Sequence, residues 1–206
     1  MTQANADAFN NATDTIIFRT GSASQARVLY NPLSFGEAPS VTPSLGGNSV
    51  TFANDGAQVR GLPSVGLFTD GSRLYIGSTG DDTVTGTAGA DGLFGGAGDD
   101  SMGGGVGGDD LLQGNQGHDT LVASAGGLNT IFGGQGDDSI DMPAAGKSPT
   151  ATNFAQGNLG NDTITAAGST GVTTLIVGNG GADVLGAGAA TTPSSSPQRT
   201  RRSAPG

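Results

Sequence analysis

The sequence predicts an all-β chain whose central part, residues 77–186, is a parallel β-roll in which two nine-residue units make one coil. Three observations predict this fold. Divided into nines from Gly77, the chain returns to the same phase in eleven units, and glycine recurs at positions one and four. The sixth position is Asp in eight units and Asn or Thr in the other three, and the eighth position is apolar in all of them. A fixed period of this kind is typical of a solenoid rather than of a disordered glycine-rich linker.

Each unit is predicted to form one turn and one short strand. Positions one to six are the turn, where glycine permits positive φ and a close approach of the backbone. Positions seven to nine are a strand whose middle side chain points inward, because side chains alternate along a strand. Coils are expected to stack about 4.8 Å apart, the usual spacing between paired strands. Stacking is needed because one unit alone cannot bury its apolar residue. The expected core is the column of eighth-position residues: Val84, Leu93, Met102, Leu112, Leu121, Ile131, Ile140, Ala155, Ile164, Ile176 and Leu185.

Alternate turns fall on opposite edges of the roll, and the two edges differ. Every insertion in the repeat (104, 123, 142–147 and 166–168) comes just before a turn of the second edge, which also loses glycine and aspartate along the chain. The sequence therefore predicts a lopsided roll. The intact edge, with Gly at one and four and Asp at six, comprises turns 77–82, 95–100, 114–119, 133–138, 157–162 and 178–183. The degenerate edge comprises turns 86–91, 105–110, 124–129, 148–153 and 169–174.

The charge of the chain indicates a cation as its partner. The net charge of −10 disfavours nucleic acid or an anionic membrane. Residues 77–186 hold thirteen aspartates against one basic residue, Lys147, and stacking places the sixth-position carboxylates in columns. Two like charges about 4 Å apart repel by about 1 kcal/mol even in water. Calcium accepts six to eight oxygens, including backbone carbonyls, whereas magnesium demands a small octahedron and zinc prefers His or Cys. The pattern therefore predicts bound calcium.

Two units carry a resemblance to a known family. Residues 95–103 (GGAGDDSMG) and 133–141 (GGQGDDSID) resemble the GGxGxDxUx nonapeptide of the RTX family of calcium-binding repeats, and the resemblance covers about half of the chain. It implies a right-handed parallel β-roll, calcium held between turns stacked on one edge, type I secretion, and folding on calcium outside the cell. By this resemblance the carboxylate ligands are Asp82, Asp100, Asp119, Asp138, Asp162 and Asp183. Carbonyl oxygens of the glycine turns complete the sites, at Gly77, Gly80, Gly95, Gly98, Gly114, Gly117, Gly133, Gly136, Gly157, Gly160, Gly178 and Gly181.

The two edges are expected to bind different amounts of calcium. Six intact turns leave room for about five ions between them. The degenerate edge is expected to hold about one ion, between the turns of Asp91 and Asp110, and then to close by neutral hydrogen bonds around Asn129, Asn153 and Thr174. A disordered linker and a metal-free β-solenoid are the alternative interpretations of the repeat.

The flanks of the repeat lack its period. Residues 1–76 are predicted to form a β-rich N-terminal cap or a small independent β domain, with strands at 15–20, 27–30 and 49–52, a turn at 54–56, and a hairpin that joins 66–69 to 73–76. Residues 187–206 are Pro/Ser-rich and basic, which predicts a disordered tail and favours a truncated or frame-shifted end. The N-terminus does not have the pattern of a Sec signal peptide, and no apolar run is long enough to span a membrane.

The chain contains neither a zinc-protease motif nor a nucleophile-elbow motif, so it is expected not to be an enzyme. It has neither HExxH nor GxSxG, and its single histidine, His118, sits at the outward fifth position of an intact turn, where a solvated loop residue is expected.

The leading hypothesis is a calcium-binding structural or interaction module, secreted or on the cell surface. The alternatives are a non-catalytic fragment of an RTX exoenzyme or toxin, and a self-assembling surface-layer or filament protein. A type I exporter and a second copy docked through the ends of the roll are the expected protein partners.

Overall fold

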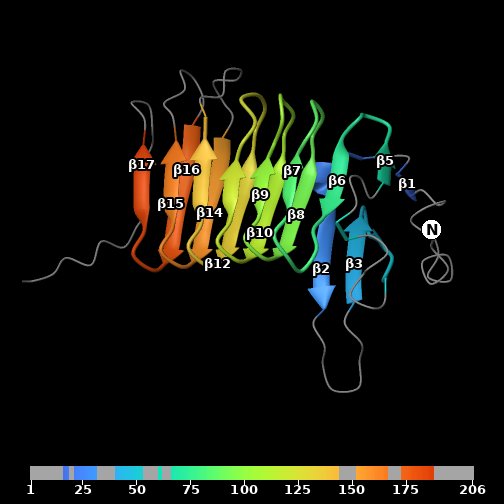
Figure 1. Cartoon of the computed structure of the whole chain (residues 1–206). Helices are drawn as coiled ribbons and strands as arrows, with labels where there is room; N and C mark the ends of the chain where they lie inside the picture. The colour runs from blue at the N-terminus through green and yellow to red at the C-terminus, as the bar shows by residue number, and fades with distance from the viewer. Residues whose placement is uncertain are drawn as a thin grey trace, which may run out of the picture.

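The computed structural model describes residues 16–18, 21–31, 40–52, 60–61, 66–143, 152–166 and 173–187. Over these residues the molecule is all-β apart from one short 3-10 helix, η1 (Ala23–Gln25). Two sheets, parallel throughout the repeat, form the two faces of a roll, and a small antiparallel sheet lies at its N-terminal end (Figure 1). The predicted parallel β-roll is confirmed.

From β6 onward, the chain passes from one sheet to the other at every turn. The larger sheet has the order β1-β5-β6-β8-β10-β12-β14-β16, and its strands are β1 (Ile16–Phe18), β5 (Gly66–Phe68), β6 (Arg73–Ile76), β8 (Gly92–Ala97), β10 (Leu111–Gln116), β12 (Thr130–Gln135), β14 (Thr152–Leu159) and β16 (Thr173–Gly180). The smaller sheet has the order β17-β15-β13-β11-β9-β7, and its strands are β7 (Thr83–Thr85), β9 (Ser101–Gly103), β11 (Thr120–Val122), β13 (Ser139–Met142), β15 (Thr163–Ala166) and β17 (Val184–Ala187).

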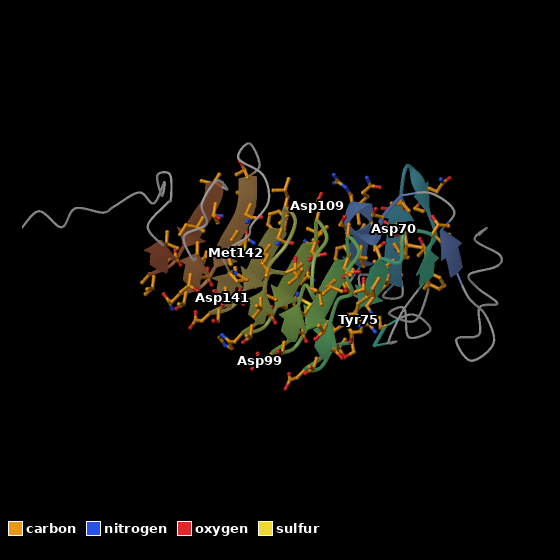
Figure 2. The ribbon with its side chains drawn as sticks, turned by 90° about the horizontal axis from the view of Figure 1, so that it is seen from above. Asp70, Tyr75, Asp99, Asp109, Asp141 and Met142 are labelled. Atoms are coloured by element: carbon orange, nitrogen blue, oxygen red, sulfur yellow. The ribbon has the colours of Figure 1, made fainter. Side chains whose placement is uncertain are left out.

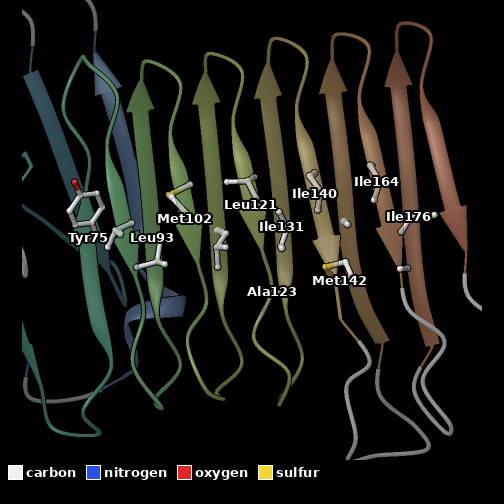
Figure 3. Packing of buried hydrophobic residues seen from close by; sticks show 14 residues of the cluster. Tyr75, Leu93, Met102, Leu121, Ala123, Ile131, Ile140, Met142, Ile164 and Ile176 are labelled. Carbon is white, nitrogen blue, oxygen red and sulfur yellow. The ribbon is translucent and has the colours of Figure 1, made fainter.

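The register of both sheets follows the nonapeptide. Leu112 pairs with Ile131 in the larger sheet, and Leu121 pairs with Ile140 in the smaller one. The eighth-position side chains of both sheets point into one thin core (Figure 3). All of them are buried except Leu185, which is partly buried against the same cluster. A fully buried Leu or Ile side chain contributes about 1.5–3 kcal/mol, so the column stabilises the stack only when many coils are in place.

The core contains three residues that the nonapeptide register counts as insertions. These residues, Ala123, Met142 and Ala166, are all buried and belong to the core cluster. Each comes two residues after an inward apolar residue, so the alternation of the strand turns it to the same side. Tyr75 is also in this cluster and pairs with Leu93, so the inward column begins one strand before Gly77.

The N-terminal residues pack on this end of the roll. Phe52 and Phe68 share a second buried cluster with Phe94, which comes from the roll strand β8. The hairpin predicted for 66–76 is confirmed, since β5 and β6 pair antiparallel, and the first two predicted strands appear as β1 and β2. The predicted turn at 54–56 lies outside the described residues. The antiparallel sheet consists of β2 (Arg27–Asn31), β3 (Ser40–Leu45) and β4 (Asn48–Ser49) in the order β2-β3-β4.

Strand β3 was not predicted, and the strand expected at 49–52 was placed too late. Pro43 lies within β3, and a proline lowers the strand tendency of a segment because it has no N–H group. The strand β4 ends at Ser49, and Phe52 makes only an isolated bridge to Val41. The pairing of β3 with β2 and its hairpin with β4 therefore decided this sheet.

Candidate metal centre

The turns of the intact edge place two residue types in the left-handed region. At position four, Gly98, Gly117 and Gly136 have φ of 110°, 130° and 118°. At position two of every intact-edge turn after the first, the φ is also positive and the residue is Gly or Asn: Asn115 has φ of 80°. The first turn differs, because neither Ser78 at position two nor Gly80 at position four has a positive φ. Glycine and asparagine tolerate this conformation best. The requirement at position two was missed from the sequence, although the alternation of Gly and Asn there is its signature.

Glycine is required at position one for a different reason, which is the lack of room for a side chain. A β-carbon added to Gly114 would lie less than 3.0 Å from both the Oδ2 atom of Asp119 and the carbonyl oxygen of Gly133. The same pair of oxygens surrounds Gly133, where they come from Asp138 and Gly157. A carboxylate oxygen of one turn and a carbonyl oxygen of the next turn therefore converge beside Gly95, Gly114 and Gly133.

The sixth-position aspartates form a continuous ladder along the intact edge. In each step, the Oδ1 atom of one aspartate accepts a hydrogen bond from the backbone N–H of the sixth residue in the preceding turn. The distances are 2.8 Å for Asp82 N–H to Asp100, 2.8 Å for Asp100 N–H to Asp119, 2.9 Å for Asp119 N–H to Asp138, 2.9 Å for Asp138 N–H to Asp162, and 3.1 Å for Asp162 N–H to Asp183. The ladder satisfies one oxygen of each carboxylate and holds the turns in register.

The second oxygen of these carboxylates is left without a partner. Five Oδ2 atoms are buried and make no hydrogen bond: those of Asp100, Asp110, Asp119, Asp138 and Asp162. Four lie on the intact edge and one, Asp110, on the degenerate edge. An unsatisfied buried polar atom costs about 1–3 kcal/mol, and more when it is charged. The arrangement is therefore incomplete without a positively charged ligand.

The donor set fits a hard cation that accepts backbone oxygens. Among the described residues, no three His, Cys, Asp or Glu side chains come together in a group that could hold a metal ion. A cation between two turns would have to combine the carboxylates with turn carbonyls such as those of Gly133 and Gly157. Calcium accepts such mixed oxygen sets, whereas zinc requires His, Cys or carboxylate side chains.

Burial makes these carboxyl groups hard to ionise in the absence of a cation. Burial raises the pKa of Asp100 to about 7. The hydrogen bond from the N–H of Asp82 lowers this pKa, and the nearby charge of Asp119 raises it further. Burial likewise raises the pKa of Asp138 to about 7 and that of Asp110 to about 6. The pKa values of Asp119 and Asp162 are raised for the same reason.

The degenerate edge replaces the carboxylates by neutral groups after two turns. The Oδ1 atom of Asp110 accepts the N–H of Asp91 at 2.9 Å, and the Oδ1 atom of Asn129 accepts the N–H of Asp110 at 3.2 Å. The side-chain amide of Asn129 donates to the carbonyl of Ser124 at 3.0 Å, and its own N–H donates to Asn153 at 2.8 Å. Thr174 is buried at the next level. The expected closure by neutral hydrogen bonds is thus present around Asn129.

The single-residue insertions lie inside these turns rather than before them. Gly86, Gly104 and Ala123 occupy equivalent places, because each donates its N–H to a backbone carbonyl in the smaller-sheet strand of the next coil. The acceptors are Gly103, Val122 and Asp141. A β-carbon at Gly104 would meet the Oδ2 atom of Asp110, whereas Ala123 carries one and stands in a turn whose sixth residue is Asn129. Loss of the carboxylate and loss of the glycine therefore occur together.

A second ladder runs along the outside of the intact edge, through the fifth positions. Asp99 on this side and Asp109 on the degenerate edge lie on opposite edges of the roll (Figure 2). The N–H of His118 donates to Asp99 at 2.8 Å, and the Nδ1 atom of His118 accepts the N–H of Asp137 at 2.8 Å. His118 is exposed, as expected, but its imidazole also serves as a link between turns, which the sequence alone did not indicate.

The family model for the RTX calcium-binding nonapeptide repeat matches residues 76–109, 104–140 and 150–169, in four copies. These residues form RTX calcium-binding repeats. The RTX repeats coincide with the turns whose buried carboxylate oxygens lack a partner, so the roll is a calcium-binding module. No curated protein and no solved structure matches the chain. No helix in the described part of the chain is long and apolar enough to cross a membrane.

Proposed function

We propose that this chain is a non-catalytic structural or interaction module that folds when its RTX repeats bind calcium, in the extracellular space or on the cell surface. The observation that carries the proposal is the row of buried Oδ2 atoms without hydrogen-bond partners. These oxygens face neighbouring turns that carry further carboxylates of the same charge. Calcium supplies the positive charge that this row requires.

The proposed ligands are the sixth-position carboxylates and the turn carbonyls. Asp100, Asp119, Asp138 and Asp162, with Asp82 and Asp183 at the two ends, would hold about five ions along the intact edge. Asp91 and Asp110 would hold about one ion on the degenerate edge, where Asp110 has the unpartnered oxygen. The carbonyls come from the position-one and position-four glycines of the intact turns.

The location and partners are proposed from the nature of the repeat. RTX repeat proteins are typically secreted, and a low-calcium interior followed by a calcium-rich exterior would delay folding until export is complete. A type I exporter is therefore a proposed partner. A second copy would dock at the end formed by β16 and β17, the last strands of the two sheets. A non-catalytic fragment of a larger RTX exoenzyme or toxin is an alternative setting for the same module.

Calcium titration followed by far-ultraviolet circular dichroism tests this proposal. We expect the metal-free chain to have little β signal and to gain it cooperatively as calcium is raised to millimolar concentration, with magnesium giving no comparable gain. The physical reason is that the stacked carboxylates oppose each other until a cation separates them. A β signal that is the same with chelator and with calcium would contradict folding on calcium.

The pH dependence of calcium binding gives a second expected result. The carboxyl groups of Asp100 and Asp138 have a pKa of about 7 in the folded, metal-free roll, above the value of about 3.9 in an unfolded chain. Their contribution to metal-free stability is therefore complete below pH of about 4 and is lost as pH rises through about 7. Calcium binds the deprotonated groups, so binding near pH 7 should release protons. We expect the calcium midpoint to rise several-fold from pH 8 to pH 6, together with proton release in weakly buffered solution. A midpoint that does not change over this range would show that these carboxyl groups are not ligands.

A further inference from the structure

The N-terminal end of the intact edge has no preceding repeat turn. Inside the stack, the position-one carbonyl of each turn lies beside the position-one glycine of the turn before it: the carbonyl oxygen of Gly114 lies beside Gly95, and that of Gly133 beside Gly114. The first turn, 77–82, has a carbonyl at Gly77 with no earlier repeat turn to meet it. Another group must therefore satisfy this carbonyl oxygen.

The guanidinium of Arg60 occupies this place. Its Nε atom donates to the carbonyl oxygen of Gly77 at 2.7 Å, and its Nη2 atom donates to the carbonyl oxygen of Ser78 at 2.5 Å. A guanidinium bridges two oxygens well, because its N–H groups form a rigid planar fork. Arg60 thereby contacts backbone oxygens of the same kind that a metal ion would use between later turns.

Neighbouring groups hold the guanidinium in position. Its Cζ atom lies 4.9 Å from the centre of the Tyr30 ring, a cation–π contact. The hydroxyl of Tyr30 donates to the carbonyl of Phe94 at 3.3 Å, and the N–H of Gly61 donates to the carbonyl of Ile76 at 2.7 Å. The charge is therefore fixed by contacts with the N-terminal sheet and with the roll itself.

The charge distribution of the roll makes this position distinctive. Among the described residues from 77 to 187 there is no Lys or Arg, while Asp82 and the aspartates above it form a continuous acidic column. The degenerate edge begins in a related way, because the guanidinium of Arg73 donates to the carbonyl of Thr85 just before turn 86–91. Both edges therefore begin with an arginine bound to a backbone carbonyl.

We propose that Arg60 is a built-in cation that closes the N-terminal end of the intact edge in place of a calcium ion. The first turn is then completed on its outer side by the protein's own charge, and the column of ions begins between turns 77–82 and 95–100. This inference rests on the proposed function for the identity of the ion that Arg60 replaces. In this role the charge of Arg60 holds the carbonyl oxygens of Gly77 and Ser78 in place, which an apolar side chain packed on Tyr30 could not do.

Hydrogen exchange of the whole chain, measured with and without calcium, tests the proposal with three variants. Arg60→Gln removes the charge, and Arg60→Lys keeps the charge but loses the fork. Arg27→Gln is the matched control, at an exposed arginine of β2, the strand that also carries Tyr30. In calcium at the wild-type saturating concentration, we expect amide exchange in turn 77–82 to accelerate at least tenfold in Arg60→Gln and less in Arg60→Lys. We expect no change in Arg27→Gln or in turn 133–138 of any variant.

A further tenfold increase in calcium concentration distinguishes whether Arg60 occupies a cation site or only makes a packing contact. We expect the added calcium to slow exchange in turn 77–82 of Arg60→Gln toward the wild-type rate, because an ion can take the vacated place beside the carbonyl oxygens of Gly77 and Ser78. Exchange in Arg60→Gln that equals that of Arg27→Gln, or that does not respond to added calcium, would overturn the proposal. The wild-type response of turn 133–138 to calcium reports folding on calcium separately, so the failure of one proposal is distinguishable from the failure of the other.

Discussion

Replacing Asp138 with Asn is expected to raise the calcium concentration at the folding midpoint at least tenfold, equivalent to about 1.4 kcal/mol. The Oδ2 atom of Asp138 is buried without a partner, and the proposed ions on both sides of its turn would use this carboxylate. Asparagine keeps the Oδ1 atom that accepts the N–H of Asp119, so the backbone ladder stays intact. On the degenerate edge, Asn129 shows that an amide fits this position, with its NH₂ group donating to a turn carbonyl. The substitution therefore removes charge and coordination while keeping the fold.

Asp137→Asn is the matched control for this prediction. Asp137 belongs to the same turn and carries the same charge, but it is exposed, and its Oδ1 atom accepts the N–H of Asn161 at 2.7 Å. We expect its calcium midpoint to stay within about twofold of the wild type, because an exposed charge is screened by solvent and salt. Circular dichroism titrations of both variants at one ionic strength provide the comparison. Equal shifts in the two variants would mean that net charge, and not coordination by Asp138, controls folding.

Replacing Gly114 with Ala is expected to destabilise the calcium-bound roll by about 3 kcal/mol, at the upper end of overpacking costs. The φ of Gly114 is not in the left-handed region, so the penalty is one of space alone. The added methyl group would collide with the Oδ2 atom of Asp119 and with the carbonyl oxygen of Gly133. Moving either oxygen disturbs the proposed calcium site, so the calcium midpoint should rise as well.

Gly103→Ala serves as the control for Gly114→Ala. Gly103 lies in β9, and a β-carbon there would meet its nearest neighbour, the Cγ2 atom of Thr85, at 3.8 Å, an ordinary contact. We expect its stability in calcium to stay within about 0.5 kcal/mol of the wild type. Thermal unfolding at saturating calcium measures both variants. Tolerance of alanine at Gly114 would show that the carboxylate and the carbonyl do not converge there as the structure places them.

The repeat illustrates how far a local period can predict a fold. The position of Leu112 or Ile140 in the core follows from its place in the nonapeptide, because strand alternation turns every eighth residue the same way. The burial of Ala123, Met142 and Ala166 follows from the same alternation, but the nonapeptide frame counted them as insertions. The N-terminal sheet could not be predicted as well, since β3 contains Pro43 and is held in the sheet by pairing with β2 and with β4 on its two sides.

The sequence by itself determined the roll, its register, and the row of aspartates on which the calcium proposal depends. These features repeat every nine residues, so each is specified many times by short-range chemistry. Only the tertiary structure decided which oxygen of each aspartate lies buried without a partner, and that Arg60 meets the carbonyl of Gly77. Those outcomes depend on how one coil lies against the next and on how the N-terminal residues pack on the first coil. Such contacts join residues about two units apart or more, and no local pattern specifies them.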